Sequence, residues 1–218
     1  MNKSLKKIVE YFLDILFPRN EIQKKLDTMT AEDFLNNIPR TRHDDKNIIT
    51  IFDYRNKFMK EAIWSLKFRR NTRLAKIFAQ IIYDEILEDL SELSVFQNFK
   101  NPIIIPIPIS SKRRRERGFN QCELIANELL NIGGDIFTQE RKVLIKTQDT
   151  PPQSRTKTKK DRLENLRDCF SIKNKEKIKG RNIILLDDVT TTGTTLKEAK
   201  RILHRHGAKK IICVTVVH

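Results

Sequence analysis

Two adjacent carboxylates, Asp187 and Asp188, are the residues of this chain best suited to chemistry. The aliphatic residues 183–186 lead directly into them, and a loop of threonines and one glycine at residues 190–195 follows. Carboxylates accept hydrogen bonds from sugar hydroxyls, and backbone N–H groups at a helix N-terminus bind phosphate. The order of these residues therefore favours a ligand that carries both a sugar and a phosphate.

A buried strand is the element that must position this acidic pair. Four consecutive aliphatic residues at 183–186 are typical of a parallel strand covered on both faces. Ligands of open α/β sheets bind beyond the carboxyl ends of such strands, where Asp187 and Asp188 would stand. The alternative is an ordinary strand, an acidic turn and a Thr-capped helix. A glycine among five threonines directly after paired carboxylates does not favour that alternative.

A second segment suited to phosphate chemistry lies at residues 105–121. An aliphatic strand that ends near Pro106 leads through Ser110 into a basic stretch, and Gly118 then permits a turn into the next helix. The basic residues are Lys112, Arg113, Arg114, Arg115 and Arg117. Guanidinium groups bind phosphate in bidentate fashion and stay charged, so we expect a loop that binds an anionic group. Taken alone, the stretch fits a solvated basic turn or a nucleic-acid patch equally well.

Strands and helices alternate along the rest of the chain, which predicts an α/β fold with an open parallel sheet flanked by helices. The predicted strands are residues 48–52, 103–106, 143–145, 183–186 and 211–217. The predicted helices are residues 58–66, 72–90, 120–131 and 194–206, with Thr72 as an N-cap.

Residues 1–47 are expected to form a small helical appendage to a main domain at residues 48–218. Helical patterns cover about residues 4–17 and 20–36, and a polar linker follows. Within the main domain, the polar and basic residues 147–165 predict a loop or flap. Its basic part at residues 153–162, with Gln153 and Arg162, predicts either a lid over the site or a plain surface loop.

The composition restricts the classes of ligand and compartment. The 218 residues include 43 Lys and Arg against 28 Asp and Glu, a formal net charge of +15. Such an excess attracts phosphate-bearing partners, whether nucleotides, nucleic acid or anionic membrane. Cys122, Cys169 and Cys213 are isolated, so we expect no disulfide, no zinc site and a cytoplasmic location. No apolar run reaches the roughly 18–20 residues that a membrane span needs.

Residues 183–195 resemble the phosphoribosyl pyrophosphate signature of type I phosphoribosyltransferases. In that family the two acidic residues hydrogen-bond the ribose 2′- and 3′-hydroxyls, and the loop after them holds the 5′-phosphate. The resemblance implies the hydroxyl-binding roles for Asp187 and Asp188. It implies phosphate-binding roles for Thr190, Thr191, Thr192, Gly193, Thr194 and Thr195. It also implies the type I phosphoribosyltransferase fold.

Several further motifs resemble the ComF group of this family, which is associated with competence for DNA uptake. Residues 118–121, Gly-Phe-Asn-Gln, follow the arginine-rich segment as they do in that group. Residues 52–54, 66–68, 151–153 and 162–165 resemble its other motifs in the same order. Members of the group often carry an N-terminal four-cysteine zinc finger. This chain has no cysteine before Cys122 and therefore lacks that finger.

The resemblance implies displacement of pyrophosphate from the anomeric carbon of phosphoribosyl pyrophosphate by an unidentified acceptor. Mg²⁺ is the implied cofactor, held by Asp187 and Asp188 through the ribose or through water. Pyrophosphate contacts are expected from Ser110, Arg113, Arg115 and Arg117. We expect the acidic pair to face the ligand on the same edge as the arginines, rather than to be buried against other cations.

Two other functions use the same sequence features. The chain could be a sensor that binds phosphoribosyl pyrophosphate without turnover, since a sensor and an enzyme share one site. It could also be a single-stranded DNA-binding accessory protein of the competence machinery, which its charge favours. Stacking surfaces for single strands need aromatic residues interleaved with basic ones, and the arginine-rich segment lacks them. In the enzyme, Phe52, Tyr54 and Trp64 could stack on an acceptor base, although such residues more often belong to the core.

Overall fold

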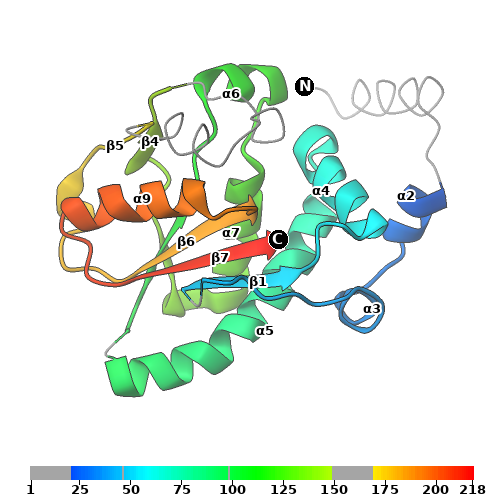
Figure 1. Cartoon of the computed structure of the whole chain (residues 1–218), viewed down its shortest axis with the longest axis horizontal. Helices are drawn as coiled ribbons and strands as arrows, with labels where there is room; N and C mark the ends of the chain where they lie inside the picture. Colours follow the sequence, from blue (N-terminus) through cyan, green and yellow to red (C-terminus); the bar gives the residue numbers. More distant parts are fainter. Residues whose placement is uncertain (1–20, 46, 98, 149–168) are drawn as a thin grey trace.

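A five-stranded parallel sheet forms the centre of the computed structural model, which describes residues 21–45, 47–97, 99–148 and 169–218 (Figure 1). The strand order is β1 (Ile48–Phe52), β7 (Ile211–Val217), β6 (Ile183–Val189), β2 (Ile103–Pro106) and β3 (Thr138–Gln139). Every neighbouring pair is parallel. The predicted open parallel sheet is confirmed, and β6 lies at its middle.

Helices cover both faces of the sheet, as the alternation of elements predicts. Helix α9 (Thr194–Arg205) packs on one face, and α5 (Thr72–Gln97), α7 (Gln121–Gly133) and α4 (Lys57–Arg69) lie on the other (Figure 1). Alternate side chains of β6 enter the two cores, with Ile183 and Leu185 on the α9 side and Ile184 and Leu186 on the opposite side. Both faces are buried, so the aliphatic run in the sequence is continuous rather than alternating.

The central strand is longer than its aliphatic residues indicate. β6 continues beyond Leu186 to Val189, with Asp187 paired to Thr215 and Val189 paired to Val217 of β7. The prediction that the strand ends at residue 186 is therefore wrong. Asp187 and Asp188 therefore belong to the hydrogen-bonded strand itself. Pairing with β7 fixes the backbone from which their side chains project more firmly than a turn would.

Residues 21–45 pack against the main domain. The helix predicted over residues 20–36 is two helices, α2 (Glu21–Leu26) and α3 (Ala31–Asn37). The reason is local, because Thr30 accepts a hydrogen bond from the Asp33 backbone and the Asp33 carboxylate accepts one from the Thr30 backbone. This capping box starts a new helix within the predicted one. The helix predicted at residues 4–17 lies outside the described residues.

The predicted strand at residues 143–145 is present as β4 (Leu144–Lys146), outside the main sheet. It pairs in antiparallel fashion with β5 (Phe170–Ile172), and the two form a separate ribbon. Most of the predicted lid, including Gln153 and Arg162, lies outside the described residues. No helix in the described part of the chain is long and apolar enough to cross a membrane.

Candidate active site at the end of the central strand

The acidic pair lies at the carboxyl end of β6 and is buried. Asp187 and Asp188 are 8% and 3% exposed. The Asp187 Oδ1 atom accepts a hydrogen bond of 2.9 Å from the Asp188 backbone N–H. This contact orients the first carboxylate along the chain and leaves the second to be oriented by neighbouring helices.

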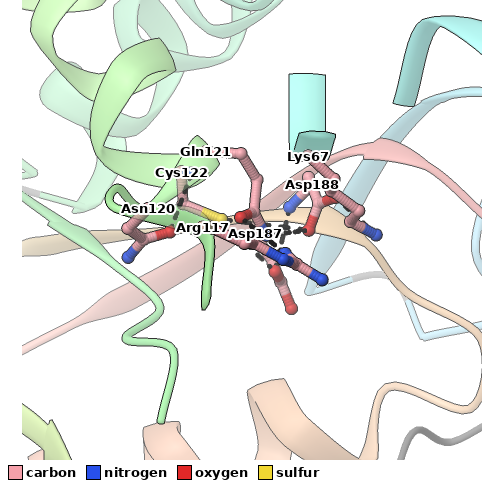
Figure 2. A network of polar contacts seen from close by, with 7 residues as sticks. All are labelled: Lys67, Arg117, Asn120, Gln121, Cys122, Asp187 and Asp188. Carbon is pink, nitrogen blue, oxygen red and sulfur yellow. Dashed lines mark hydrogen bonds and ion pairs between the residues drawn. The ribbon is translucent and has the colours of Figure 1, made fainter. Parts of the chain in front are cut away.

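Two side chains from different helices hold Asp188. The Lys67 ammonium reaches from α4 to within 2.8 Å of Asp188 Oδ2, and Gln121 Nε2 at the start of α7 donates to Asp188 Oδ1 over 3.1 Å. Figure 2 shows Lys67 and Gln121 beside the acidic pair, with dashed lines for their contacts. Asp188 is thus buried against a cation, contrary to the expectation that the pair faces the ligand alone. The sequence could not show this, because Lys67 is 121 positions from its partner.

The arginine-rich segment is a helix rather than the predicted loop. Helix α6 (Ser111–Arg117) begins after Ser110, whose hydroxyl accepts a hydrogen bond from the Arg113 backbone N–H, and it ends at Gly118 with φ +77°. Lys, Arg and Glu have high helix propensity, so an N-cap serine and a left-handed C-terminal glycine are enough to define one helical segment.

The three arginines expected to bind pyrophosphate differ in position. The Arg117 guanidinium donates to Gln121 Oε1 over 3.2 Å, and Gln121 in turn donates to Asp188, so Arg117 joins the network of the acidic pair. Burial and the neighbouring Arg113 charge lower the pKa of Arg117 from its usual value, although Asp188 acts in the opposite sense. Arg115 is exposed on α6, and we find no contact between it and the acidic pair in the described residues.

The corner between α6 and α7 is fixed by buried polar contacts. Asn120, only 1% exposed, donates through Nδ2 to the Ile107 carbonyl oxygen at 2.9 Å and caps α7 by accepting from the Cys122 backbone N–H. The Cys122 thiol lies 3.5 Å from Asp187 Oδ1. Burial, and after it the two carboxylates, raise the pKa of Cys122 well above its usual value, so this group remains a thiol.

The two carboxylates have opposite protonation tendencies. Burial and the neighbouring Asp188 charge raise the pKa of Asp187 to about 7. Burial also opposes ionisation of Asp188, but the Lys67 ammonium outweighs it and holds the pKa of Asp188 below its usual value. Burial likewise disfavours the Lys67 ammonium, yet Asp188 raises the pKa of Lys67. At neutral pH the site therefore contains an ionised Asp188–Lys67 pair beside a partly protonated Asp187.

The threonine loop connects β6 to α9. The Thr190 backbone N–H donates to the Val217 carbonyl at 2.9 Å, which fixes the start of the loop, and the hydroxyls of Thr192 and Thr194 are 2.6 Å apart. Gly193 adopts φ +69° at the N-cap of α9 and supplies no side chain to cap it. The first N–H groups of a twelve-residue helix are therefore not satisfied by an N-cap side chain. Thr191 is exposed and Thr195 is half-buried.

The acidic pair has the chemistry of a site for a hard divalent cation. Asp187, Asp188 and Cys122 bring potential ligand atoms within 4.8 Å of one another. Mg²⁺ binds oxygen ligands, so the two carboxylates fit it and the protonated thiol does not. A cation at Asp188 would meet Lys67 already in place.

Lys67 and Gln121 are the residues of this site that the sequence did not single out for chemistry. Both belong to segments that resemble ComF motifs, residues 66–68 and 118–121, but neither segment shows from its own pattern that it faces the acidic pair. The topology brings them together, since α4 and α7 lie on one face of the sheet at the carboxyl end of β6.

Comparison with known proteins identifies the family. Residues 76–218 match the family model described as the phosphoribosyl transferase domain. The chain belongs to the phosphoribosyltransferase family. The fold and family expected from residues 183–195 are thereby confirmed.

Similar sequences identify the ComF group within this phosphoribosyltransferase family. "Competence protein ComFC" of Bacillus subtilis is 32% identical over 172 residues, which cover 77% of this chain and 64% of the relative. "DNA utilization protein YhgH" of Salmonella typhimurium is 25% identical over 166 residues, 76% of this chain and 69% of the relative. The chain thus spans just under two thirds of the Bacillus protein.

Among solved structures, a hypoxanthine phosphoribosyltransferase from Staphylococcus aureus is similar to this family member. The two are 16% identical, with a TM-score of 0.37, and the match covers 64% of this chain and 62% of the other.

Proposed function

We propose that the chain binds phosphoribosyl pyrophosphate with Mg²⁺ at the Asp187–Asp188 site and transfers the phosphoribosyl group to an acceptor, releasing pyrophosphate. The observation that carries this proposal is the position of the acidic pair. It lies on the last residues of the central strand, directly before a loop that leads into the N-terminus of α9. This arrangement places groups suited to ribose hydroxyls beside groups suited to a phosphate.

Each element of the site would have a separate task. Asp187 and Asp188 would accept hydrogen bonds from the ribose hydroxyls, while the loop N–H groups hold the 5′-phosphate. Arg117, at the same edge, would attract the pyrophosphate group. The bond from the anomeric carbon to pyrophosphate breaks, a bond to the acceptor forms, and the acceptor loses its proton. Mg²⁺, when bound, would neutralise charge on the departing pyrophosphate.

Thermal stability with ligand tests this site. Binding to the folded state raises the melting temperature, so we expect a rise with Mg²⁺ and phosphoribosyl pyrophosphate for the wild type. The double variant Asp187→Asn, Asp188→Asn should show little or no rise. The matched control is Asp84→Asn with Asp135→Asn, because both of these aspartates are exposed. An equal rise in the wild type and the Asp187/Asp188 variant would refute the site.

Turnover is a separate question from binding. A sensor would give the same thermal response without chemistry, so pyrophosphate release must be measured with a panel of purine, pyrimidine and amine acceptors. Release that depends on one acceptor supports the enzyme. Binding without release from any acceptor supports the sensor.

Single-stranded nucleic acid binding is a second candidate function, supported by an exposed aromatic–arginine surface. This surface consists of Trp64, Phe68, Arg69, Arg70 and Arg117, and the Arg70 guanidinium lies 5.8 Å from the ring centroid of the buried Phe119. Trp64 and Phe68, 42% and 56% exposed, lie 5.6 Å apart between ring centroids on one face of α4. The Arg117 guanidinium lies 5.0 Å from the Phe68 ring centroid.

The arginine-rich segment has no aromatic residue interleaved in its own sequence, but the fold brings Phe68 of α4 against Arg117. In α4, Trp64 and Phe68 are one turn apart, and Arg69 and the C-cap residue Arg70 directly follow Phe68. Phe52, in contrast, is fully buried in the core and is not available to stack on a base. Rings beside guanidinium groups suit the stacking of bases along a charged backbone. The names of the relatives, which refer to competence and DNA utilization, agree with a DNA-linked role.

Binding of a fluorescent oligothymidylate, followed by anisotropy, tests this second function. Trp64→Ala and Phe68→Ala should each weaken binding by about fivefold or more, since stacking is worth about 1–3 kcal/mol per base. Ile136→Ala is the control, because Ile136 is a comparably exposed apolar residue outside this surface. Affinity should fall with salt and survive loss of the acidic pair. Equal affinity in all variants would exclude this surface.

A further inference from the structure

Both oxygens of Asp188 are already engaged by groups of the protein. Gln121 Nε2 donates to Oδ1 at 3.1 Å, and the Lys67 ammonium lies 2.8 Å from Oδ2. Among the described residues, Lys67 forms the only ion pair with either carboxylate. A divalent cation that binds Asp188 directly at Oδ2 therefore meets the Lys67 ammonium at that oxygen.

Of the two contacts, the one made by Lys67 is the more easily released. Gln121 is 4% exposed and is held on its other side by Arg117. The Lys67 side chain is 23% exposed, lies in the last turn of α4, and ends a flexible four-carbon stem. The Lys67 side chain is therefore partly exposed along its length, whereas Gln121 is buried and held from two sides.

We propose that Lys67 is an internal counter-ion that holds Asp188 when no ligand is bound and competes with a divalent cation for the same carboxylate oxygen. A divalent cation at Oδ2 would lie within a few ångströms of the ammonium, and the repulsion between the two positive charges opposes binding of both at this oxygen. Lys67 therefore stabilises the buried acidic pair when no ligand is bound. It also lowers the affinity of the pair for a divalent cation. This inference rests on the proposed function in so far as Mg²⁺ binds at the acidic pair.

Removing the charge at position 67 tests the competition directly, with Mg²⁺ alone as the probe. Lys67→Met keeps most of the side-chain volume and removes the ammonium. Without Mg²⁺ this variant should melt below the wild type, because Asp188 loses its buried partner. With Mg²⁺ it should regain stability, and its calorimetric affinity for Mg²⁺ should rise by about tenfold or more, since the competing ammonium is gone.

Two further variants serve as controls. Lys60→Met makes the same substitution at an exposed position of the same helix and should leave Mg²⁺ affinity unchanged. Lys67→Arg keeps the competing charge and should bind Mg²⁺ no more tightly than the wild type. If Lys67→Met does not fold, Lys67→Gln retains a donor to Asp188 without the charge and should show the same gain.

The outcomes separate this inference from the proposed function. Mg²⁺ affinity that stays equal or falls in Lys67→Met and Lys67→Gln would overturn the competition, even if the wild type still responds to phosphoribosyl pyrophosphate. If the acidic-pair variant responds to that ligand as the wild type does, the proposed function fails. A gain in Mg²⁺ affinity that disappears when Asp188→Asn is added to Lys67→Met supports the assignment of the shared oxygen.

Discussion

Two chemically identical side chains, Asp187 and Asp188, have different properties at the end of β6. The difference comes from their neighbours, because Lys67 and Gln121 contact Asp188 while Asp187 has the Asp188 backbone and the Cys122 thiol. The sequence shows two carboxylates in the right order. It does not show which of them is ionised, since that depends on contacts made across the fold.

The raised pKa of Asp187 predicts a pH effect on stability. A carboxyl group with a pKa of about 7 in the folded state and 3.8 in the unfolded state binds more protons when folded. Its contribution to stability therefore decreases as pH rises from about 4 to 7. Asp187→Asn has no carboxyl group to titrate at this position. The unfolding free energy of this variant should therefore increase relative to that of the wild type by roughly 1–3 kcal/mol from pH 5 to pH 8. Urea denaturation across this range measures it.

Asp188→Asn provides the contrasting case. The lowered pKa of Asp188 means that its ionised form stabilises the protein above the unfolded pKa, and this contribution is lost as pH falls through the lower folded pKa. Asp188→Asn should therefore be less stable than the wild type throughout pH 5–8, because Lys67 is left without its partner. The raised pKa of Asp187 would be contradicted if the unfolding free energies of the wild type and Asp187→Asn changed with pH in the same way.

At the scale of elements, local patterns predicted the strands and helices, and capping decided where they begin and end. The prediction of a loop at residues 110–117 is wrong because Ser110 and Gly118 provide both ends of a helix. The predicted N-cap at Thr72 is also displaced, since the Asn71 side chain accepts from the Leu74 backbone N–H. Competing cap residues lie within one or two positions of each other, so sequence alone does not choose between them.

The left-handed conformation of Gly193 in the threonine loop predicts a specific effect of substitution. A Cβ there would lie 2.9 Å from Ile48 Cδ1, in addition to the cost of φ +69°. Gly193→Ala should lower stability by about 1–2 kcal/mol or more and abolish the thermal response to phosphoribosyl pyrophosphate. Melting curves with and without ligand measure both effects.

Gly180→Ala is the matched control for this prediction. Gly180 has φ +70°, and a Cβ there meets no atom within 4 Å. Gly180→Ala therefore has the same unfavourable backbone conformation but no crowding of the threonine loop. Its thermal response to phosphoribosyl pyrophosphate should be retained. A full ligand response in Gly193→Ala would show that the loop does not bind the phosphate.

At the scale of the whole molecule, residues 21–45 share a core with the main domain. Phe34 of α3 is fully buried, with ring contacts to Phe52 and Phe78 at centroid distances of 6.1 and 5.3 Å. The division into residues 1–47 and 48–218 stays a prediction. Hydrophobic periodicity indicated the helices of the first part but not the surface to which they attach, because any apolar face satisfies an amphipathic helix.

Truncation of Phe34 tests whether this region stabilises the whole domain. Phe34→Ala should cost about 3–5 kcal/mol, as for a large aromatic residue in a packed core. Leu35→Ala, at a neighbouring position 37% exposed, should cost little. Circular dichroism and tryptophan emission should report one transition for both variants. Two separate transitions would show that the N-terminal region unfolds independently.

Trp64 is the single tryptophan of the chain and lies one helical turn before Lys67 on α4. Its indole ring is stacked near the Arg69 guanidinium, with 5.3 Å between them, so its emission depends on the conformation of this last turn. The molecule consequently carries an intrinsic optical reporter on the same helix as the residue that contacts Asp188. Titrations can be followed by intrinsic fluorescence, without any attached dye.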